Sequence, residues 1–227
     1  MSVSRRLPKE CAAKYQLGKK EANMRVVVVG ATGTIGKAVV KALERDHEVL
    51  PVSRNSKIRV DITDPESIRT MYKTIGAIDA VISAAGQARF APLMQLTDAD
   101  FQFSLNNKLM GQVNLVRFGM DSMRDHGCFT LTAGILARSP MIGSGVISLV
   151  NAGLEGFVRA AALEAPRGIR VNIVSPPWIT DTLRALGMDT SPGISPEAAS
   201  KLYVQSLVGN RSGVVIEARS LSEELDL

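Results

Sequence analysis

The stretch RVVVVGATGTIG, residues 25–36, decides the fold of this chain. A β-branched run ends in three glycines spaced Gly-x-x-Gly-x-x-Gly, and a helical pattern follows to about residue 45. Gly30 would permit a tight turn, Gly33 would let the backbone approach a pyrophosphate, and Gly36 would let the helix pack against the sheet. Because a strand precedes this turn and a helix follows it, the stretch predicts a dinucleotide-binding βαβ unit rather than a purely structural turn.

Strand and helix patterns alternate along the rest of the chain. Short apolar, β-branched runs indicate strands buried on both faces, and the segments between them have helical spacing. Asp64 before Pro65, and Thr97 with Asp100, are typical helix starts. We therefore expect an α/β fold: a single Rossmann-type doubly wound parallel sheet with helices on both faces. The expected strands are 25–29, 48–53, 58–60, 79–83, 129–132, 170–174 and 214–217, and the expected helices are 35–45, 97–124, 144–165 and 197–207, with a further helix from residue 64.

Composition excludes several classes of protein. Of the 227 residues 45% are hydrophobic but only 4% aromatic, so a platform that stacks single-stranded nucleic acid is not expected. Two cysteines and two histidines leave no disulfide framework and no thiolate or histidine metal centre. The sequence has no run of about 18 apolar residues, so we expect no membrane span and a cytoplasmic protein.

The positive charge is concentrated at the amino end. Residues 1–23 carry six basic and two acidic side chains, a net +4 of the chain's +5. Residues 24–227 are thus near neutral, and no nucleic-acid partner is expected for them. We expect 1–23 to be a disordered basic extension and 24–227 to form one NAD(P)-binding domain. Alternatively, residues 1–23 are a weak organelle-targeting signal, or the protein starts at Met24.

The residues after the second expected strand indicate which nucleotide would bind. NAD requires an acid there for the ribose 2′-hydroxyl, whereas NADP requires a cation for the 2′-phosphate. The strand ends without an acid: Ser53 offers a hydroxyl and Arg54 a guanidinium, although Arg54 could also be a solvated loop cation. We therefore expect NADP rather than NAD. Asp61 follows the third strand, where its carboxylate could accept from the adenine amino group or serve only in a turn.

These motifs resemble those of the short-chain dehydrogenase/reductase family, over about residues 24–218. The resemblance is carried by the glycine turn, by Asp61-Ile62-Thr63, by Ser83-Ala84-Ala85-Gly86 and by RGIRVNIVSP at residues 167–176. It implies a nicotinamide cofactor and a homo-dimer or homo-tetramer that packs the helices near 99–124 and 144–165. It also implies that a set of residues contacts the cofactor: Gly30, Thr32, Gly33, Thr34, Ile35, Gly36, Ser53, Arg54, Asp61, Ile62, Ala84, Ala85, Gly86, Pro176, Ile179 and Thr180.

The resemblance breaks at the catalytic positions. The family reduces a carbonyl with a tyrosine as acid, a lysine four residues later that lowers the tyrosine pKa, a serine and an asparagine. The corresponding positions here hold Ile147, Asn151, Ala133 or Gly134, and Lys108, and no Tyr-x-x-x-Lys occurs anywhere in the chain. The chain therefore resembles a divergent subgroup that lacks the usual active-site residues.

The sequence alone leaves two functions open. The first is a degenerate reductase-like protein that binds NADP(H) with weak or no redox activity. The second is a divergent NADP-dependent carbonyl or alcohol oxidoreductase, in which Lys108 or a bound water donates the proton to a small carbonyl ligand. Lys108 could instead pair with a carboxylate or with cofactor phosphates. An NmrA-type regulatory role rests on the glycine spacing alone, and nucleic-acid binding through residues 1–23 is weaker still.

Overall fold

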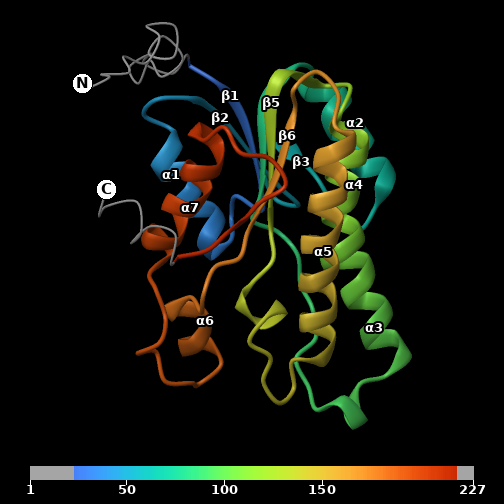
Figure 1. Ribbon diagram of the computed structural model, residues 1–227, viewed down its shortest axis with the longest axis vertical. Helices are drawn as coiled ribbons and strands as arrows, with labels where there is room; N and C mark the ends of the chain where they lie inside the picture. Colours follow the sequence, from blue (N-terminus) through green and yellow to red (C-terminus); the bar gives the residue numbers. More distant parts are fainter. Residues whose placement is uncertain (1–22, 219–227) are drawn as a thin grey trace, which may run out of the picture.

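The computed structural model describes residues 23–218 and contains one sheet of seven parallel strands (Figure 1). Their order is β3-β2-β1-β4-β5-β6-β7, so the sheet grows outward in both directions from β1. The expected doubly wound α/β fold is confirmed. The predicted extension 1–23 lies outside the described residues apart from Asn23. The strands are β1 (Arg25–Val29), β2 (Glu48–Ser53), β3 (Ile58–Arg59), β4 (Ile78–Ser83), β5 (Met123–Thr132), β6 (Arg170–Val174) and β7 (Val215–Ile216).

Helices cover both faces of the sheet. In Figure 1, α1 and α7 lie together on one face, and α2, α4 and α5 lie on the other. The helix α6 and the loops at the lower end of the view follow the carboxyl ends of the strands. The helices are α1 (Thr34–Leu43), α2 (Pro65–Ile75), α3 (Asp98–Ser104), α4 (Gly111–Gly119), α5 (Gly145–Glu164), α6 (Thr180–Ala185) and α7 (Pro196–Val208).

The central strand β1 is buried on both faces, which is why its sequence is a run of valines. Val27 and Val29 point into the core beneath α2, α4 and α5, while Val26 and Val28 point into the core beneath α1 and α7. All four are at most 1% exposed. Continuous apolar strands of this kind are typical of parallel sheets that are covered on both sides.

Both expected helix starts are confirmed. The Asp64 carboxylate accepts a hydrogen bond of 2.9 Å from the Glu66 N–H at the start of α2. Thr97 and Asp100 form a reciprocal capping box at the start of α3. These side chains satisfy amide groups that a first helical turn leaves without partners.

The helix expected over 97–124 is shorter and less regular than predicted. Helical residues run from Asp98 to Gly119 as α3, a π-helical turn at Leu105–Met110 and α4. Gly119 packs closely against α2, where a Cβ would lie 2.6 Å from the Tyr72 ring. The strand β5 then begins at Met123, six residues before its expected start. The short helix α6 was not expected, since TDTLRA carries little apolar periodicity.

The helix α5 is the one described helix that is long and apolar enough, by length and composition alone, to cross a membrane. It has 20 residues and a mean hydropathy of 1.4. Core helices of globular proteins pass the same test, so this carries little weight. In the structure, Val146, Val150, Leu154 and Val158 form the buried side of α5 against the sheet.

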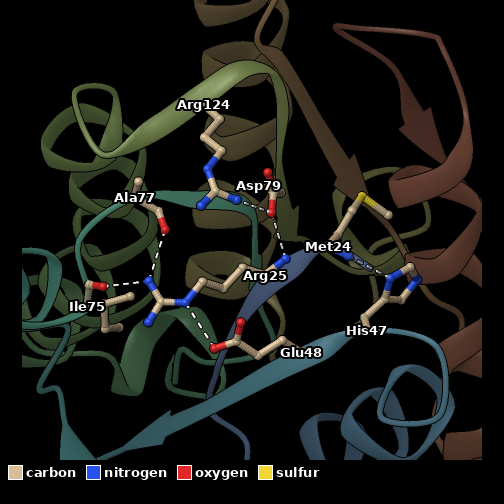
Figure 2. Close-up of polar contacts among 8 residues, drawn as sticks. All are labelled: Met24, Arg25, His47, Glu48, Ile75, Ala77, Asp79 and Arg124. Atoms are coloured by element: carbon tan, nitrogen blue, oxygen red, sulfur yellow. Dashed lines mark hydrogen bonds and ion pairs between the residues drawn. The ribbon is translucent and has the colours of Figure 1, made fainter. Parts of the chain in front are cut away.

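A polar cluster joins four strands at the amino end of the sheet, away from the loops that follow the strands (Figure 2). The backbone N–H of Arg25 donates to the Asp79 carboxylate at 2.7 Å, and the Arg124 guanidinium donates to the same oxygen at 2.8 Å. The Arg25 side chain pairs with Glu48 at 3.0 Å and donates to two backbone carbonyls between α2 and β4. Asp79 therefore connects β1, β4 and β5 within the first two residues of each strand.

We expect Asp79→Ala to lower the free energy of unfolding by about 1–2 kcal/mol, because the partly buried Arg25 amide would lose a charged acceptor. Chemical denaturation of the purified variants measures this. Asp125→Ala is the matched control: Asp125 is exposed and lies 3.7 Å from its partner Arg167, so its removal should change stability by less than about 0.5 kcal/mol. Equal losses in the two variants would contradict the role given to Asp79.

Candidate nicotinamide nucleotide site

The turn between β1 and α1 is built from backbone atoms in close contact. Gly30 has a φ of 82° and its N–H donates to the Val52 carbonyl at 2.9 Å. A Cβ at Gly30 would lie 2.8 Å from the Ala84 oxygen, and one at Gly36 would lie 2.1 Å from the Gly30 oxygen. No side chain caps α1, so its first N–H groups remain available to an anion.

A cavity of about 310 Å³ lies over this turn, at the ends of β1 to β4. It brings together most of the residues predicted to contact the cofactor: Gly30, Thr32, Gly33, Ser53, Arg54, Asp61, Ile62, Ala84, Ala85 and Gly86. Five lining residues were not predicted: Val29, Asn55, Val60, Gln87 and Asn107. Of these, Asn107 could have been predicted from its position next to Lys108. Its Oδ1 accepts a hydrogen bond of 2.8 Å from the Gln87 N–H.

Two of the polar residues in this cavity are partly engaged within the protein. Asp61 accepts hydrogen bonds from the Thr63 N–H and hydroxyl, which together with the nearby Arg54 lower the pKa of its carboxyl. The Ser53 hydroxyl lies 2.7 Å from that of Ser56. Arg54, by contrast, forms no ion pair or hydrogen bond with any residue in 23–218. Its guanidinium is the cation on this wall that is available to a phosphate.

A second cavity, of about 400 Å³, continues from the first toward β5 and β6. Both cavities are lined by Ala84, Ala85 and Gly86, so together they form one trough along the carboxyl ends of the strands. The predicted Ile35, Pro176 and Ile179 line this second cavity, as do Phe90, Ile147 and Trp178. Thr34, Gly36 and Thr180 line neither cavity.

Lys108 enters the second cavity from the π-helical turn. Its Nζ donates to the Ala133 carbonyl at 3.1 Å, and its stem passes so close to Gly86 that a Cβ there would lie 3.0 Å from Lys108 Cγ. Burial lowers the pKa of the Lys108 amine to about 8. Single π turns are frequent at functional sites, because the wider turn re-aims a side chain.

Gln112 fixes the start of α4 to the end of β5. This buried side chain donates to the Thr132 carbonyl and accepts from the Thr132 N–H, each at 2.8 Å. These two hydrogen bonds satisfy the backbone N–H and C=O of Thr132, the last residue of β5, in place of a neighbouring strand. Sequence patterns did not point to Gln112, because its role depends on two elements 20 residues apart.

Neither of the two described tyrosines lines the trough. Tyr72 donates to the Leu115 carbonyl at 2.7 Å, and the Tyr203 hydroxyl lies 2.7 Å from that of Thr132, which lines the second cavity. Both tyrosines are buried, and burial raises their pKa values. Neither hydroxyl can therefore contact a ligand in the trough directly.

A family model described as enoyl-(acyl carrier protein) reductase matches residues 13–212. The chain belongs to the short-chain dehydrogenase/reductase family. It is 30% identical over 196 residues to carbonyl reductase family member 4 of Danio rerio, with 76% of this chain and 80% of the relative covered.

Solved structures of the family match the fold closely. The protein lin1944 from Listeria innocua is 36% identical with a TM-score of 0.83, over 86% of this chain and 98% of that one. A small-chain dehydrogenase in complex with NADPH is 25% identical with a TM-score of 0.77, over 86% and 96% of the two chains.

The positions expected to hold the family's catalytic residues lie at or beside the second cavity. Ala133, Gly134, Ile147 and Lys108 line it. Asn151 donates to the Gly134 carbonyl at 3.4 Å, and a Cβ at Gly134 would lie 3.3 Å from the Asn151 amide nitrogen. The Oδ1 of Asn151 is buried without a hydrogen-bond partner among the described residues. The expected positions thus lie together at one end of the trough.

We expect Gly36→Ala to destabilise the protein by roughly 1–3 kcal/mol or to prevent folding, because its Cβ would overlap the Gly30 carbonyl. Gly156→Ala is the control in a helix interior: nothing lies within 4 Å of a Cβ there, so alanine should stabilise α5 by about 0.5–1 kcal/mol. Urea denaturation of both variants measures the contrast. Similar effects of the two substitutions would refute the tight turn.

Proposed function

We propose that this protein binds NADP(H) in the trough and performs little or no conventional carbonyl reduction. The observation that carries the proposal is the side-chain set at the catalytic positions. Ala133 or Gly134, Ile147 and Asn151 carry no group that can donate a proton at neutral pH. The glycine turn, by contrast, lines the first cavity beside the uncapped start of α1, an arrangement suited to a diphosphate.

The preference for NADP rests on Arg54. The wall of the first cavity has an unpaired guanidinium after β2 and no acid at that position. A guanidinium binds a phosphate with two parallel hydrogen bonds, whereas a ribose hydroxyl would favour a carboxylate. The NADPH bound to one relative of known structure supports the same choice.

The cofactor would supply hydride transfer at its nicotinamide ring when bound. The chain's own contribution would be to hold it: the start of α1 and the glycine turn at the diphosphate, and Arg54 at the 2′-phosphate. The unpartnered Oδ1 of Asn151 is a buried acceptor beside the second cavity, suited to a ribose hydroxyl. None of these groups supplies the proton that carbonyl reduction consumes.

The alternative is a divergent carbonyl or alcohol oxidoreductase, and Lys108 favours it. An amine with a pKa of about 8 holds a proton at neutral pH and releases it readily. Lys108 lines the cavity in which a small carbonyl ligand would lie beside the nicotinamide ring. A bound water could donate the proton in its place.

The predicted assembly and location belong to the same proposal. A homo-dimer or homo-tetramer would pack α4 and α5, which form the outer layer on one face of the sheet. Leu149 and Leu163 on α5 are 48% and 89% exposed, which suits such a contact. A cytoplasmic location and the absence of a nucleic-acid partner follow from the composition, as argued above.

We expect Arg54→Ala to weaken NADPH binding about tenfold or more and to leave NADH binding within about twofold, because only NADPH carries the 2′-phosphate. Fluorescence titration of the purified protein with both nucleotides measures this. Arg59→Ala removes an equal charge from an exposed position that lines neither cavity, and should change neither affinity. Tighter binding of NADH than of NADPH by the unaltered protein would contradict the NADP assignment.

We expect no oxidation of NADPH above the buffer rate with a broad panel of aldehydes and ketones. Absorbance at the nicotinamide band, followed at saturating NADPH, measures this. Turnover that disappears in Lys108→Ala while NADPH affinity persists would instead establish the alternative function. Turnover unaffected by that substitution would point to water as the donor.

A further inference from the structure

Within residues 23–218, Lys108 is the one ionisable side chain that lines the second cavity. The rest of the lining consists of apolar side chains, backbone, threonine hydroxyls and the indole of Trp178. Charged groups on the neighbouring elements are paired with one another and lie outside the lining: Arg89 with Asp100, Arg138 with Glu155, and Arg184 with Asp181. The ammonium group of Lys108 therefore enters a mostly apolar space in which the described residues offer no counter-ion.

The position of this charge is determined by its surroundings. Its Nζ is held by the Ala133 carbonyl, and its stem is held against Gly86. Gln112 in turn connects the same helix to the end of β5. The amine thus lies at the side of the cavity between the ends of β4 and β5, and cannot swing away into solvent without losing these contacts.

The inference rests on the proposed function, in which NADP(H) lies along the trough. With the 2′-phosphate at Arg54, the nicotinamide end reaches the second cavity, since Ala84, Ala85 and Gly86 line both cavities. The two redox forms differ there by one charge: the oxidised ring is a pyridinium cation, and the reduced ring is neutral. We propose that the Lys108 ammonium makes the site selective for NADPH over NADP⁺, so that the protein distinguishes the redox state of the cofactor pool.

The expected selectivity follows from like-charge repulsion. Two unit charges that are several ångströms apart near a protein surface repel strongly enough to change an equilibrium about tenfold, or about 1.4 kcal/mol. The diphosphate and the 2′-phosphate are common to both forms, so their contributions cancel in the ratio of the two dissociation constants. Only groups near the nicotinamide ring therefore affect the ratio of the two dissociation constants.

The selectivity should decrease with increasing pH. Because the pKa of Lys108 is about 8, the ammonium is present below that pH and repels the oxidised ring. Above pH 8 the amine becomes neutral, and the affinity for NADP⁺ should rise toward that for NADPH. By linkage, NADP⁺ binding near pH 8 should release a proton from Lys108, whereas NADPH binding should not.

The test is the ratio of the NADP⁺ and NADPH dissociation constants, measured by isothermal titration calorimetry at pH 6.5 and 9.5. For the unaltered protein the ratio should be about tenfold larger at pH 6.5 than in Lys108→Met, and should approach the variant's value at pH 9.5. Lys108→Arg keeps the charge at every pH, so its ratio should stay high and independent of pH. Arg54→Ala should weaken both forms equally and leave the ratio unchanged.

The outcomes separate this inference from the function on which it rests. If both nucleotides bind and the ratio is the same in the unaltered protein and in Lys108→Met, the inference fails while the cofactor site stands. If neither nucleotide binds the unaltered protein, both fail. If Lys108→Met does not fold, Lys108→Arg still tests the inference, because arginine keeps its charge at both pH values. A ratio of NADP⁺ to NADPH dissociation constants that falls with pH in Lys108→Arg, as in the unaltered protein, would overturn the role of Lys108.

Discussion

The contact between Gly36 and the Gly30 carbonyl is the constraint on which the rest of the structure depends. A hydrogen atom at Gly36 lets α1 begin directly against the turn, and any side chain would overlap backbone that cannot move away. The helix start therefore lies at the end of β1, where its free N–H groups face the trough. The ends of β2 and β4 complete the same wall, because Gly30 also contacts Val52 and Ala84.

Features set by short stretches of sequence could be predicted. The valines of β1, the glycine turn and the helix starts at Asp64 and Thr97 each depend on neighbours within a few residues. The close packing of Gly119 against Tyr72 could not, because the two residues lie on different helices. The Asp79 cluster, the π turn and the Gln112 pair are likewise contacts between distant segments. The glycines of the turn were predicted because they lie in one short stretch. Gln87 and Asn107 were missed because their place in the lining of the first cavity depends on distant segments.

The positions expected to be catalytic are in contact with the loops around the second cavity. Asn151 donates to the Gly134 carbonyl in the loop after β5, and Ile147 lines the cavity. The lining of this cavity is mostly apolar, which strengthens every charge interaction inside it. Burial of Lys108 beside this lining lowers the pKa of its amine.

A site that binds a redox cofactor without turning it over can still respond to the cofactor's state. Binding energy from the diphosphate and from Arg54 is the same for both forms, so it sets affinity and contributes nothing to discrimination. Discrimination requires a group that interacts differently with the two rings, and in this apolar cavity a fixed ammonium does so through repulsion alone. In the proposed function, the positions expected to be catalytic would lack the proton donor that reduction requires, so binding would not lead to turnover. Lys108 would then be the main electrostatic influence on the nicotinamide end of the trough.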